Sequence, residues 1–160
     1  MSCYLMRNRI GVSKGVVQKI FVSQKDKSQR TPMQKIVVDK DGVCEDKFYG
    51  KDPQRSVLIA SIDSYKLAQD KNITVAYGSL GENILMDYNP YDLLVGTQIK
   101  IGDAILEISQ NCTMCKSLTK INKKLPKLLK NDRGVFAKVI KSGIIHEGDD
   151  IYIMYFKYEK

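Results

Sequence analysis

The sequence has few of the features that mark a membrane, secreted or repetitive protein. No stretch approaches the roughly 18 apolar residues that a membrane-spanning helix needs. The opening residues, MSCYLMRNRIGVSKG, are interrupted by charge too often for a secretory signal. No repeat period and no low-complexity block is present. We therefore expect a soluble, cytoplasmic protein in which residues 1–160 form a single domain.

Histidine is nearly absent, which limits the catalytic chemistry. The one histidine, His146, lies in Ile145-His146-Glu147-Gly148, a pattern typical of a solvent-facing turn. A Ser-His-Asp triad is therefore excluded unless His146 serves in it. The four cysteines do not indicate a disulfide framework, because cytoplasmic thiols stay reduced.

Positive charge is in excess, with 26 Lys and Arg against 18 Asp and Glu and a net charge of +8. This balance favours an anionic partner, either nucleic acid or a small molecule that carries phosphate, although it is also compatible with simple solubility. The lysines of residues 116–130 lie mostly opposite a leucine stripe and have no aromatic residues between them. That pattern indicates a solvated helix face and argues against nucleic acid.

Short runs of valine and isoleucine, separated by turn residues, predict β-strands. Gly102-Asp103 and Gly148-Asp149 are expected to form tight turns between such runs. Seven or more short strands favour a barrel or a sandwich. The predicted strands are 15–23, 35–39, 82–87, 98–102, 104–109, 134–140 and 150–158.

Two segments have helical spacing of apolar residues. Residues 56–71 are predicted to form one helix, with Leu58, Ile62, Tyr65 and Ala68 on its apolar face. Residues 116–130 are predicted to form two short helices, because Pro126 lacks the donor that an unbroken helix needs. The apolar stripe of the second segment consists of Leu118, Ile121, Leu125, Leu128 and Leu129. The polar stretch 24–32 is predicted to be a mobile loop.

Cys112 and Cys115 form a Cys-x-x-Cys pair in 109-SQNCTMCKSLTK-120. One such pair is only half of a tetrahedral zinc site, and a redox pair would favour a βαβ setting that is not predicted here. Cys3 and Cys44 are interpreted as inert, buried thiols. Cys115 follows a strand and precedes a helix, where the helix amides and Lys116 would favour the thiolate. A thiolate is both a nucleophile and a soft metal ligand.

Four segments, in order, give the chain a resemblance to a known family. These are 33-MQKIVVDKDGVCEDKFYGKDPQRSVLIAS-61, 78-GSLGENI-84, 92-DLLVGTQIKIGDAILEISQNCTMCKSL-118 and 133-RGVFAKVIKSGIIHEGDDI-151. Over residues 14–155 the chain resembles the MOSC domain family, the module named after the C-terminal part of molybdenum cofactor sulfurase. The resemblance implies a mainly β fold, a barrel of short, mostly antiparallel strands with a few peripheral helices.

The resemblance also implies a cofactor and a role for one cysteine. Cys115 is similar to the signature cysteine of the family, which ligates molybdenum or carries sulfur as a persulfide. Cys112 has no counterpart and is interpreted as an accessory thiol. The implied cofactor is the molybdenum cofactor (molybdopterin); the family is also associated with pyridoxal phosphate. Relatives reduce N-hydroxylated compounds and take electrons from a separate reductase.

The matched segments supply the candidate cofactor-binding residues. Amides near Gly81 could approach an anion, Asn83 could pair with a heterocycle edge, and Arg133 beside Gly134 could grip a phosphate. Glu82 and Asn83 could instead make turn hydrogen bonds, and Arg133 could simply follow a helix end. The remaining candidates are Lys51 and Arg55, which could equally be surface charges, and Tyr49.

The chain departs from the family pattern at several positions. Where the family commonly reads Gly-Asp-Arg-His, this sequence has Glu45, Lys47 and Phe48 in place of the glycine, arginine and histidine. Met114 replaces a proline that often precedes the signature cysteine. Because Phe48 can neither ligate a metal nor transfer a proton, histidine-based chemistry is not expected there.

Three functions follow as hypotheses. The first is a molybdenum-dependent reductase component with Cys115 as the metal ligand. The second is a persulfide carrier on Cys115 that transfers sulfur to an acceptor. The third is a non-catalytic basic barrel that binds nucleic acid or a protein through the lysine-rich helices.

Overall fold

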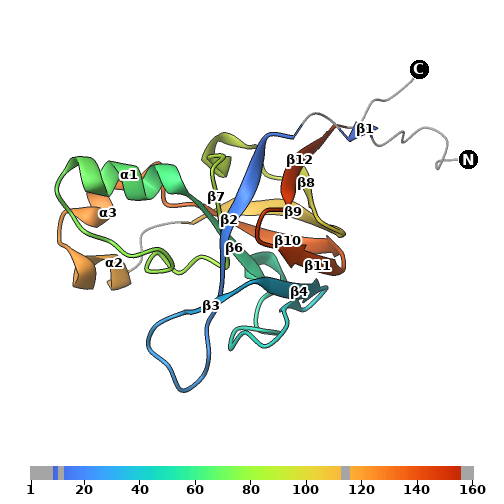
Figure 1. The fold of residues 1–160 in the computed structure, drawn as a ribbon, viewed down its shortest axis with the longest axis horizontal. Coiled ribbons are helices and arrows are strands. Elements are labelled where there is room, and N and C mark those ends of the chain that lie inside the picture. Colours follow the sequence, from blue (N-terminus) through green and yellow to red (C-terminus); the bar gives the residue numbers. More distant parts are fainter. Residues whose placement is uncertain (1–8, 11–12, 113–115, 156–160) are drawn as a thin grey trace, which may run out of the picture.

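Nine strands form one sheet in the order β1-β12-β8-β9-β10-β6-β7-β2-β3 in the computed structural model, which describes residues 9–10, 13–112 and 116–155. Strand β12 also pairs with β2, so the strands from β12 through β2 close into a barrel (Figure 1). The strands are β1 (Arg9–Ile10), β2 (Gly15–Val22), β3 (Thr31–Met33), β4 (Lys35–Asp39), β5 (Gly42–Val43), β6 (Val57–Ser61), β7 (Ile84–Met86), β8 (Gln98–Ile101), β9 (Ala104–Asn111), β10 (Val135–Lys141), β11 (Gly143–His146) and β12 (Asp150–Tyr155).

The strand pairs are antiparallel except for one. Strands β6 and β7 run parallel, with Ile59 opposite Ile84. A second sheet, in the order β11-β4-β5, is antiparallel throughout. The expected fold, a mainly β barrel of short and mostly antiparallel strands, is confirmed.

The barrel interior is filled by alternate residues of the strands. In β9 the side chains of Leu106 and Ile108 are fully buried, whereas those of the alternate residues Ile105 and Glu107 are partly exposed. The inward residues of the second sheet, such as Val38 and Ile145, belong to the same apolar core. Burial of each such side chain contributes about 1.5–3 kcal/mol, so this core is the main source of the barrel's stability.

Glycines form the two turns that the sequence predicts. Gly102 joins β8 to β9 with φ of +57°, and Gly148 precedes β12 with φ of +86°. Glycine adopts this left-handed conformation without the steric cost that a Cβ atom brings. Both turn predictions are confirmed.

The prediction of one helix over residues 56–71 is wrong in its first third. Residues Val57–Ser61 form β6, which is buried along its whole length between β10 and β7. Helix α1 begins only at Ile62 and ends at Asp70; the side chain of Ser61 caps it by accepting a hydrogen bond of 3.1 Å from the amide of Asp63. A strand that is buried on both faces lacks the alternation that distinguishes it from a buried helix.

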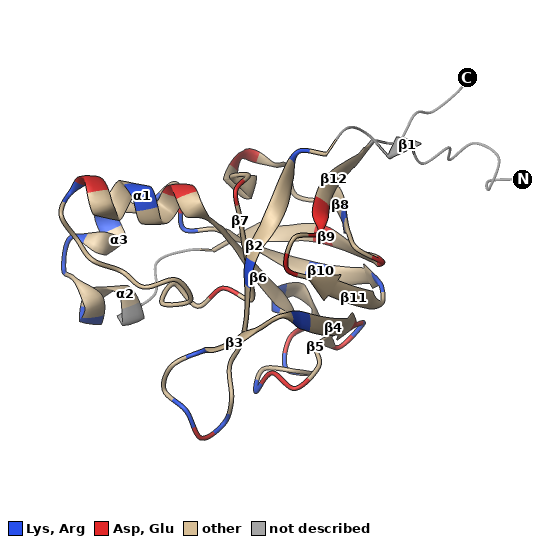
Figure 2. Cartoon of the chain, in the orientation of Figure 1, with Lys and Arg blue, Asp and Glu red and all other residues tan. Residues whose placement is uncertain are grey.

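The two helices predicted around Pro126 are confirmed as α2 (Lys116–Ile121) and α3 (Leu125–Leu128), with Pro126 in the first turn of α3. Leu118, Leu125 and Leu129 are buried in a second apolar cluster between the helices and the barrel, whereas Ile121 is 38% exposed. The side chains of Lys120, Lys123, Lys124, Lys127 and Lys130 are exposed. Figure 2 shows basic positions along α2 and α3.

Short segments account for the remaining differences. Strands β1, β3, β5 and β11 were not predicted, and β3 begins at the end of the stretch 24–32 that was expected to be loop. The described residues also include the 3-10 helices η2 (Pro53–Arg55) and η3 (Pro90–Asp92), which lie in connections between strands. Within the described ranges, no helix is both long and apolar enough to cross a membrane.

Candidate functional site

Two arginine side chains flank Gly81 on the connection that leads from α1 to β7. A Cβ atom built on Gly81 would lie 3.9 Å from Nη2 of Arg133 and 3.9 Å from Nε of Arg30. Gly81 has φ of +88°, a left-handed conformation that favours glycine. We call Arg30 and Arg133, together with the acidic residues Asp46 and Glu82, the arginine cluster.

Arg133 is the most buried cation of this cluster, with 4% of its surface exposed. Its Nε and Nη1 atoms are buried and have no hydrogen-bond partner among the described residues. The next residue, Gly134, has φ of +123°, and a Cβ atom there would lie 2.4 Å from the carbonyl oxygen of Ile59. This close approach to β6 fixes the backbone that presents Arg133. Unpaired buried N–H groups on a cation are costly, and an anionic ligand would remove that cost.

Arg30 comes from the connection between β2 and β3, so it reaches the cluster from a distant part of the sequence. Its Nη1 atom lies 3.6 Å from Oδ2 of Asp46, and its side chain is 16% exposed. Burial lowers the pKa of Arg30, while the charges of Asp46 and Glu82 oppose that effect. Arginine is not deprotonated in proteins, so the guanidinium keeps its charge.

Asp46 connects Arg30 to three other groups of the protein by accepting their hydrogen bonds. Its Oδ2 accepts hydrogen bonds from the amide of Ser23 at 2.9 Å and from Nδ2 of Asn83 at 3.0 Å. Its Oδ1 accepts from the amide of Phe48 at 2.9 Å. Asp46 was not among the predicted site residues. The available signal was that it is the one residue of the Gly-Asp-Arg-His pattern that this chain retains.

Glu82 is fully buried beside Arg133. Its Oε2 accepts a hydrogen bond of 2.5 Å from the hydroxyl of Tyr65 and one of 3.3 Å from the amide of Gly78, whereas Oε1 has no hydrogen-bond partner in the described chain. Burial raises the pKa of Glu82, although the hydrogen bonds and the charge of Arg133 act in the opposite direction. The pKa of Tyr65 is also raised, first by burial and then by the charge of Glu82.

Asn83 directs its side chain toward the protein interior. Its Oδ1 accepts a hydrogen bond from the amide of Leu58 at 3.1 Å, and its Nδ2 donates to the carbonyl of Phe21 at 3.2 Å as well as to Asp46. The amide thus joins β2, β6 and the Asp46 turn. These contacts give Asn83 a positioning role, and its pairing with a heterocycle stays a prediction.

The other predicted cofactor residues lie on exposed positions. The guanidinium carbon of Arg55 lies 4.6 Å from the centre of the Phe136 ring, and Phe136 pairs across the sheet with Leu58, which contacts Gly81. Lys51 is exposed in the turn before η2. The hydroxyl of Tyr49 donates a hydrogen bond of 2.7 Å to Asp39, which raises the pKa of Tyr49 to about 12. The structure therefore brings Gly81, Glu82 and Arg133 together, whereas Arg55, Lys51 and Tyr49 lie on exposed positions.

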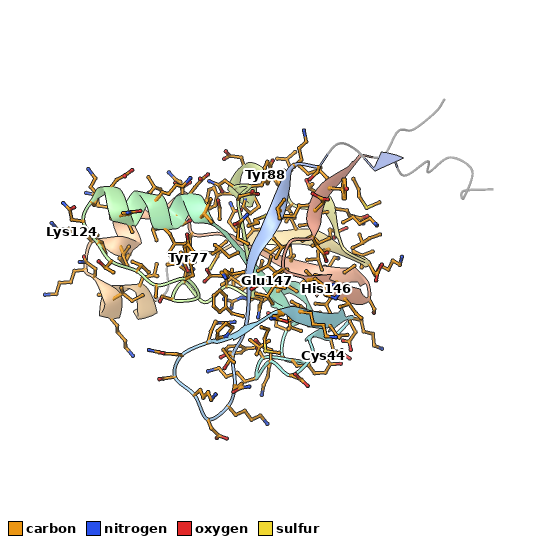
Figure 3. All side chains as sticks on the ribbon, viewed as in Figure 1. Cys44, Tyr77, Tyr88, Lys124, His146 and Glu147 are labelled. Carbon is orange, nitrogen blue, oxygen red and sulfur yellow. The ribbon has the colours of Figure 1, made fainter. Side chains whose placement is uncertain are left out.

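Cys115, the predicted metal ligand, lies outside the described residues, as does Cys3. Cys112 is buried, and its amide donates a hydrogen bond of 2.9 Å to the carbonyl of Gly134, the residue after Arg133. The thiol of Cys44 is half-buried and 3.5 Å from Oδ2 of Asp39; burial raises its pKa, which disfavours a reactive thiolate. His146 is exposed, as predicted, but it is the last residue of β11 and not part of the turn before β12 (Figure 3).

A surface groove of about 470 Å³ lies next to the arginine cluster. It runs between α1 and residues 72–77, where the exposed ring of Tyr77 packs edge-on against Tyr65 at 4.9 Å between ring centres. Figure 3 labels Tyr77. Tyr65 is shared by the groove and the cluster, because its hydroxyl is bound to Glu82. No group of three or more His, Cys, Asp or Glu side chains within the described part of the chain is arranged to hold a metal ion.

Solved structures with the same fold include three named proteins. The YuaD protein from Bacillus subtilis has a TM-score of 0.77 and 16% identity, over 89% of this chain and 97% of that chain. YiiM from Geobacillus stearothermophilus has a TM-score of 0.71 and 17% identity, over 88% and 75%. YiiM from Escherichia coli has a TM-score of 0.62 and 15% identity, over 86% and 70%. At these identities the likeness shows the fold alone.

The sequence itself gives the family. No curated protein matches it at a significant level. The family model of the MOSC domain matches residues 45–152, which include Asp46, the Gly81–Asn83 segment and Arg133. The chain belongs to the MOSC domain family.

Proposed function

We propose that the chain binds the molybdenum cofactor, with Cys115 as the protein ligand of the metal and the phosphate end of the cofactor held at Gly81 by Arg133. The cofactor is a pterin with a dithiolene and a terminal phosphate, and when bound it supplies the redox chemistry. The role of this chain is to bind, orient and shield it.

The observation that carries the proposal is the state of Arg133. Its Nε and Nη1 atoms are buried without a hydrogen-bond partner among the described residues, and its Nη2 atom lies 3.9 Å from the position that a Cβ atom would take on Gly81. A guanidinium with free donors fits the geometry of a phosphate, which accepts two parallel hydrogen bonds. The residues around Gly81 therefore fit the phosphate end of the implied cofactor.

The position of Cys112 supports a role for Cys115. Cys112 precedes Cys115 by three residues, and its amide is bound to Gly134, beside Arg133. A metal ligand and a phosphate-binding arginine must be near one another if one cofactor is to reach both. Cys112 itself is buried and is assigned to anchoring this segment.

The remaining predicted residues are proposed in more limited roles. Arg55, which lies over the ring of Phe136, is proposed to contact the cofactor. Asn83 and Glu82 are proposed to position the two arginines of the cluster. Lys51 and Tyr49 are proposed to lie at the edge of the cofactor site. An association with pyridoxal phosphate stays a prediction.

The reaction class is proposed from the family. Members that reduce N-hydroxylated compounds require a small-molecule substrate and a separate electron-donating reductase. The groove beside Tyr65 and Tyr77 has the size of a small-molecule site, and two aromatic rings suit a planar substrate. We propose this groove as the substrate entrance.

The test is elemental analysis of protein produced with molybdate in a host that makes the cofactor. We expect bound molybdenum in the wild type and in Cys112→Ser, and loss of molybdenum in Cys115→Ser. Arg133→Gln should lower cofactor retention with the fold unchanged by circular dichroism. Repeated absence of molybdenum from the wild type contradicts the proposal.

The two alternatives give different results in the same preparations. Sulfane sulfur on Cys115 without molybdenum would favour a persulfide carrier. Salt-dependent binding of nucleic acid that Cys115→Ala leaves unchanged would favour a basic barrel acting through α2 and α3.

A further inference from the structure

We infer that the arginine cluster is a proton-coupled oxyanion site: a tetrahedral oxyanion above Gly81 is bound by Arg30 and Arg133 while Glu82 takes up one proton from solvent. This deepens the proposed function, because the phosphate end of the cofactor is one source of such an anion and a free inorganic oxyanion is another.

The first evidence is where buried polar atoms without a hydrogen-bond partner gather; one of them, Nη1 of Arg30, is in the ion pair with Asp46. Within the described residues, the buried side-chain nitrogen and oxygen atoms that lack a hydrogen-bond partner are Nη1 of Arg30, Oε1 of Glu82, and Nε and Nη1 of Arg133. All belong to the arginine cluster. Because such atoms are rare in native proteins, their concentration at one place indicates a ligand that completes them.

The second evidence is that the two guanidinium groups meet beside Gly81. Gly81 has no side chain, and a Cβ atom there would lie 3.9 Å from Nη2 of Arg133 and 3.9 Å from Nε of Arg30. An oxyanion above this glycine would meet donors from two directions. Arg30 reaches the site from the connection between β2 and β3, and Arg133 from the residue before Gly134.

The charges of the cluster require a proton. With both carboxyl groups ionised, the two arginines are balanced by Asp46 and Glu82, so the cluster has no net charge to attract an anion. Both oxygens of Asp46 already accept hydrogen bonds, whereas Oε1 of Glu82 has no partner. Protonation at Oε1 of Glu82 leaves one positive charge and adds an O–H donor that can point to the anion.

The groups that face Glu82 oppose protonation, and burial of the carboxyl group outweighs them. Tyr65 from α1 and the amide of Gly78 hold Oε2, and the charges of Arg133 and Arg30 act on the carboxyl group. Burial raises the pKa of Glu82, which brings proton uptake closer to neutral pH. Binding of a further negative charge raises it again.

Sulfate is the appropriate probe, because it stays a dianion across the pH range of interest, whereas a phosphate group titrates at about pH 6. Isothermal titration calorimetry at about pH 5.5, 6.5 and 7.5 would measure sulfate binding to protein made without the cofactor. The affinity of the wild type for sulfate should fall by up to about tenfold per pH unit above the pKa of Glu82. Glu82→Gln mimics the protonated form, so its affinity should not change with pH. His146→Asn removes the one histidine, which lies outside the cluster, and should keep the wild-type pH dependence.

Two results would overturn the inference: no sulfate binding by the wild type at any of these pH values, or the same pH dependence in Glu82→Gln as in the wild type. Arg133→Gln should abolish binding, and unchanged binding in that variant would place the anion elsewhere. If Glu82→Gln fails to fold, proton uptake by the wild type can be measured by titrating sulfate in two buffers of different ionisation enthalpy. Zero uptake overturns the coupling.

A final comparison separates the two sources and the two proposals. If the phosphate of the cofactor occupies the site, cofactor-loaded protein should no longer bind sulfate. If cofactor-loaded protein still binds sulfate, the site is one for a free oxyanion. Sulfate binding without molybdenum in any preparation rejects the proposed function alone. Molybdenum without sulfate binding rejects this inference alone.

Discussion

Asn83 and Asp46 are joined by a hydrogen bond of 3.0 Å from Nδ2 to Oδ2. This contact connects two segments that are far apart in the sequence, the Gly-Glu-Asn segment and the Glu-Asp-Lys-Phe turn. Because Asp46 also pairs with Arg30, the contact determines where one of the two cluster arginines lies. The two family motifs are thus parts of one hydrogen-bonded unit.

Replacement of Asn83 by alanine should lower the free energy of unfolding by about 2–4 kcal/mol, because the amide of Leu58 and the carboxylate of Asp46 lose a buried partner. Urea denaturation measures this loss. Asn131→Ala is the matched control at an exposed position and should change stability by less than about 0.5 kcal/mol. Equal effects of the two changes would contradict the structural role of Asn83.

Gly134→Ala should be more damaging than Gly50→Ala, although both glycines have positive φ. A Cβ atom at Gly50 has no atom within 4 Å, so only the backbone conformation costs energy there, about 1–2 kcal/mol. At Gly134 the Cβ atom would also collide with the carbonyl of Ile59. We expect a loss at least about 1 kcal/mol larger than for Gly50→Ala, measured by urea denaturation. Similar losses in the two variants would show that β10 shifts to accept the methyl group.

Glu45 offers a stabilising substitution. It has φ of +72° at the place where the family commonly has glycine. Glu45→Gly relieves the left-handed strain of about 1–2 kcal/mol, at some cost in backbone entropy, so a net gain of about 0.5–1 kcal/mol is expected. Thermal unfolding checks this. Lys47→Gly, two residues on and without a positive φ, should instead destabilise the protein.

Glu82 should make stability depend on pH with a defined sign. Because its pKa is raised in the folded protein, the group contributes stability that is fully present below the pKa of the unfolded chain, about 4.3, and is lost as pH rises through the folded pKa. Glu82→Gln removes this dependence, so the variant should become more stable relative to the wild type as pH rises from about 4 to 8. Denaturation curves across this range test the prediction. A constant difference would show that the two states share one pKa.

Local patterns were sufficient for most strands and turns, and insufficient where remote segments meet. The alternation in β8 and β9 and the glycine of the turn between them identify that hairpin from the sequence alone. Strand β6 was mistaken for a helix because Leu58, Ile62 and Tyr65 happen to have helical spacing while the strand is buried on both faces.

The candidate site was predictable only in part, because it is formed where segments that are distant in the sequence meet. Gly81, Glu82 and Arg133 stand within recognisable segments. Arg30 lies in a polar stretch with no pattern to distinguish it, and Tyr65 was assigned to the apolar face of a helix. Each reaches the cluster through a contact with a residue that is distant in the sequence, Tyr65 with Glu82 and Arg30 with Asp46, and hydrophobic periodicity carries no information about such contacts.

The single parallel pair, β6 and β7, has a consequence for how this protein can vary. Parallel neighbours need a long crossover, and here residues 62–83 supply both α1 and the Gly81 segment. Pairing between β6 and β7 fixes only the two ends of that crossover. Its middle, around residues 71–77, can therefore lengthen or shorten while the strand register is preserved. Relatives with different substrates are therefore expected to differ first in the length and sequence of this segment, while Arg30 and Arg133 are retained.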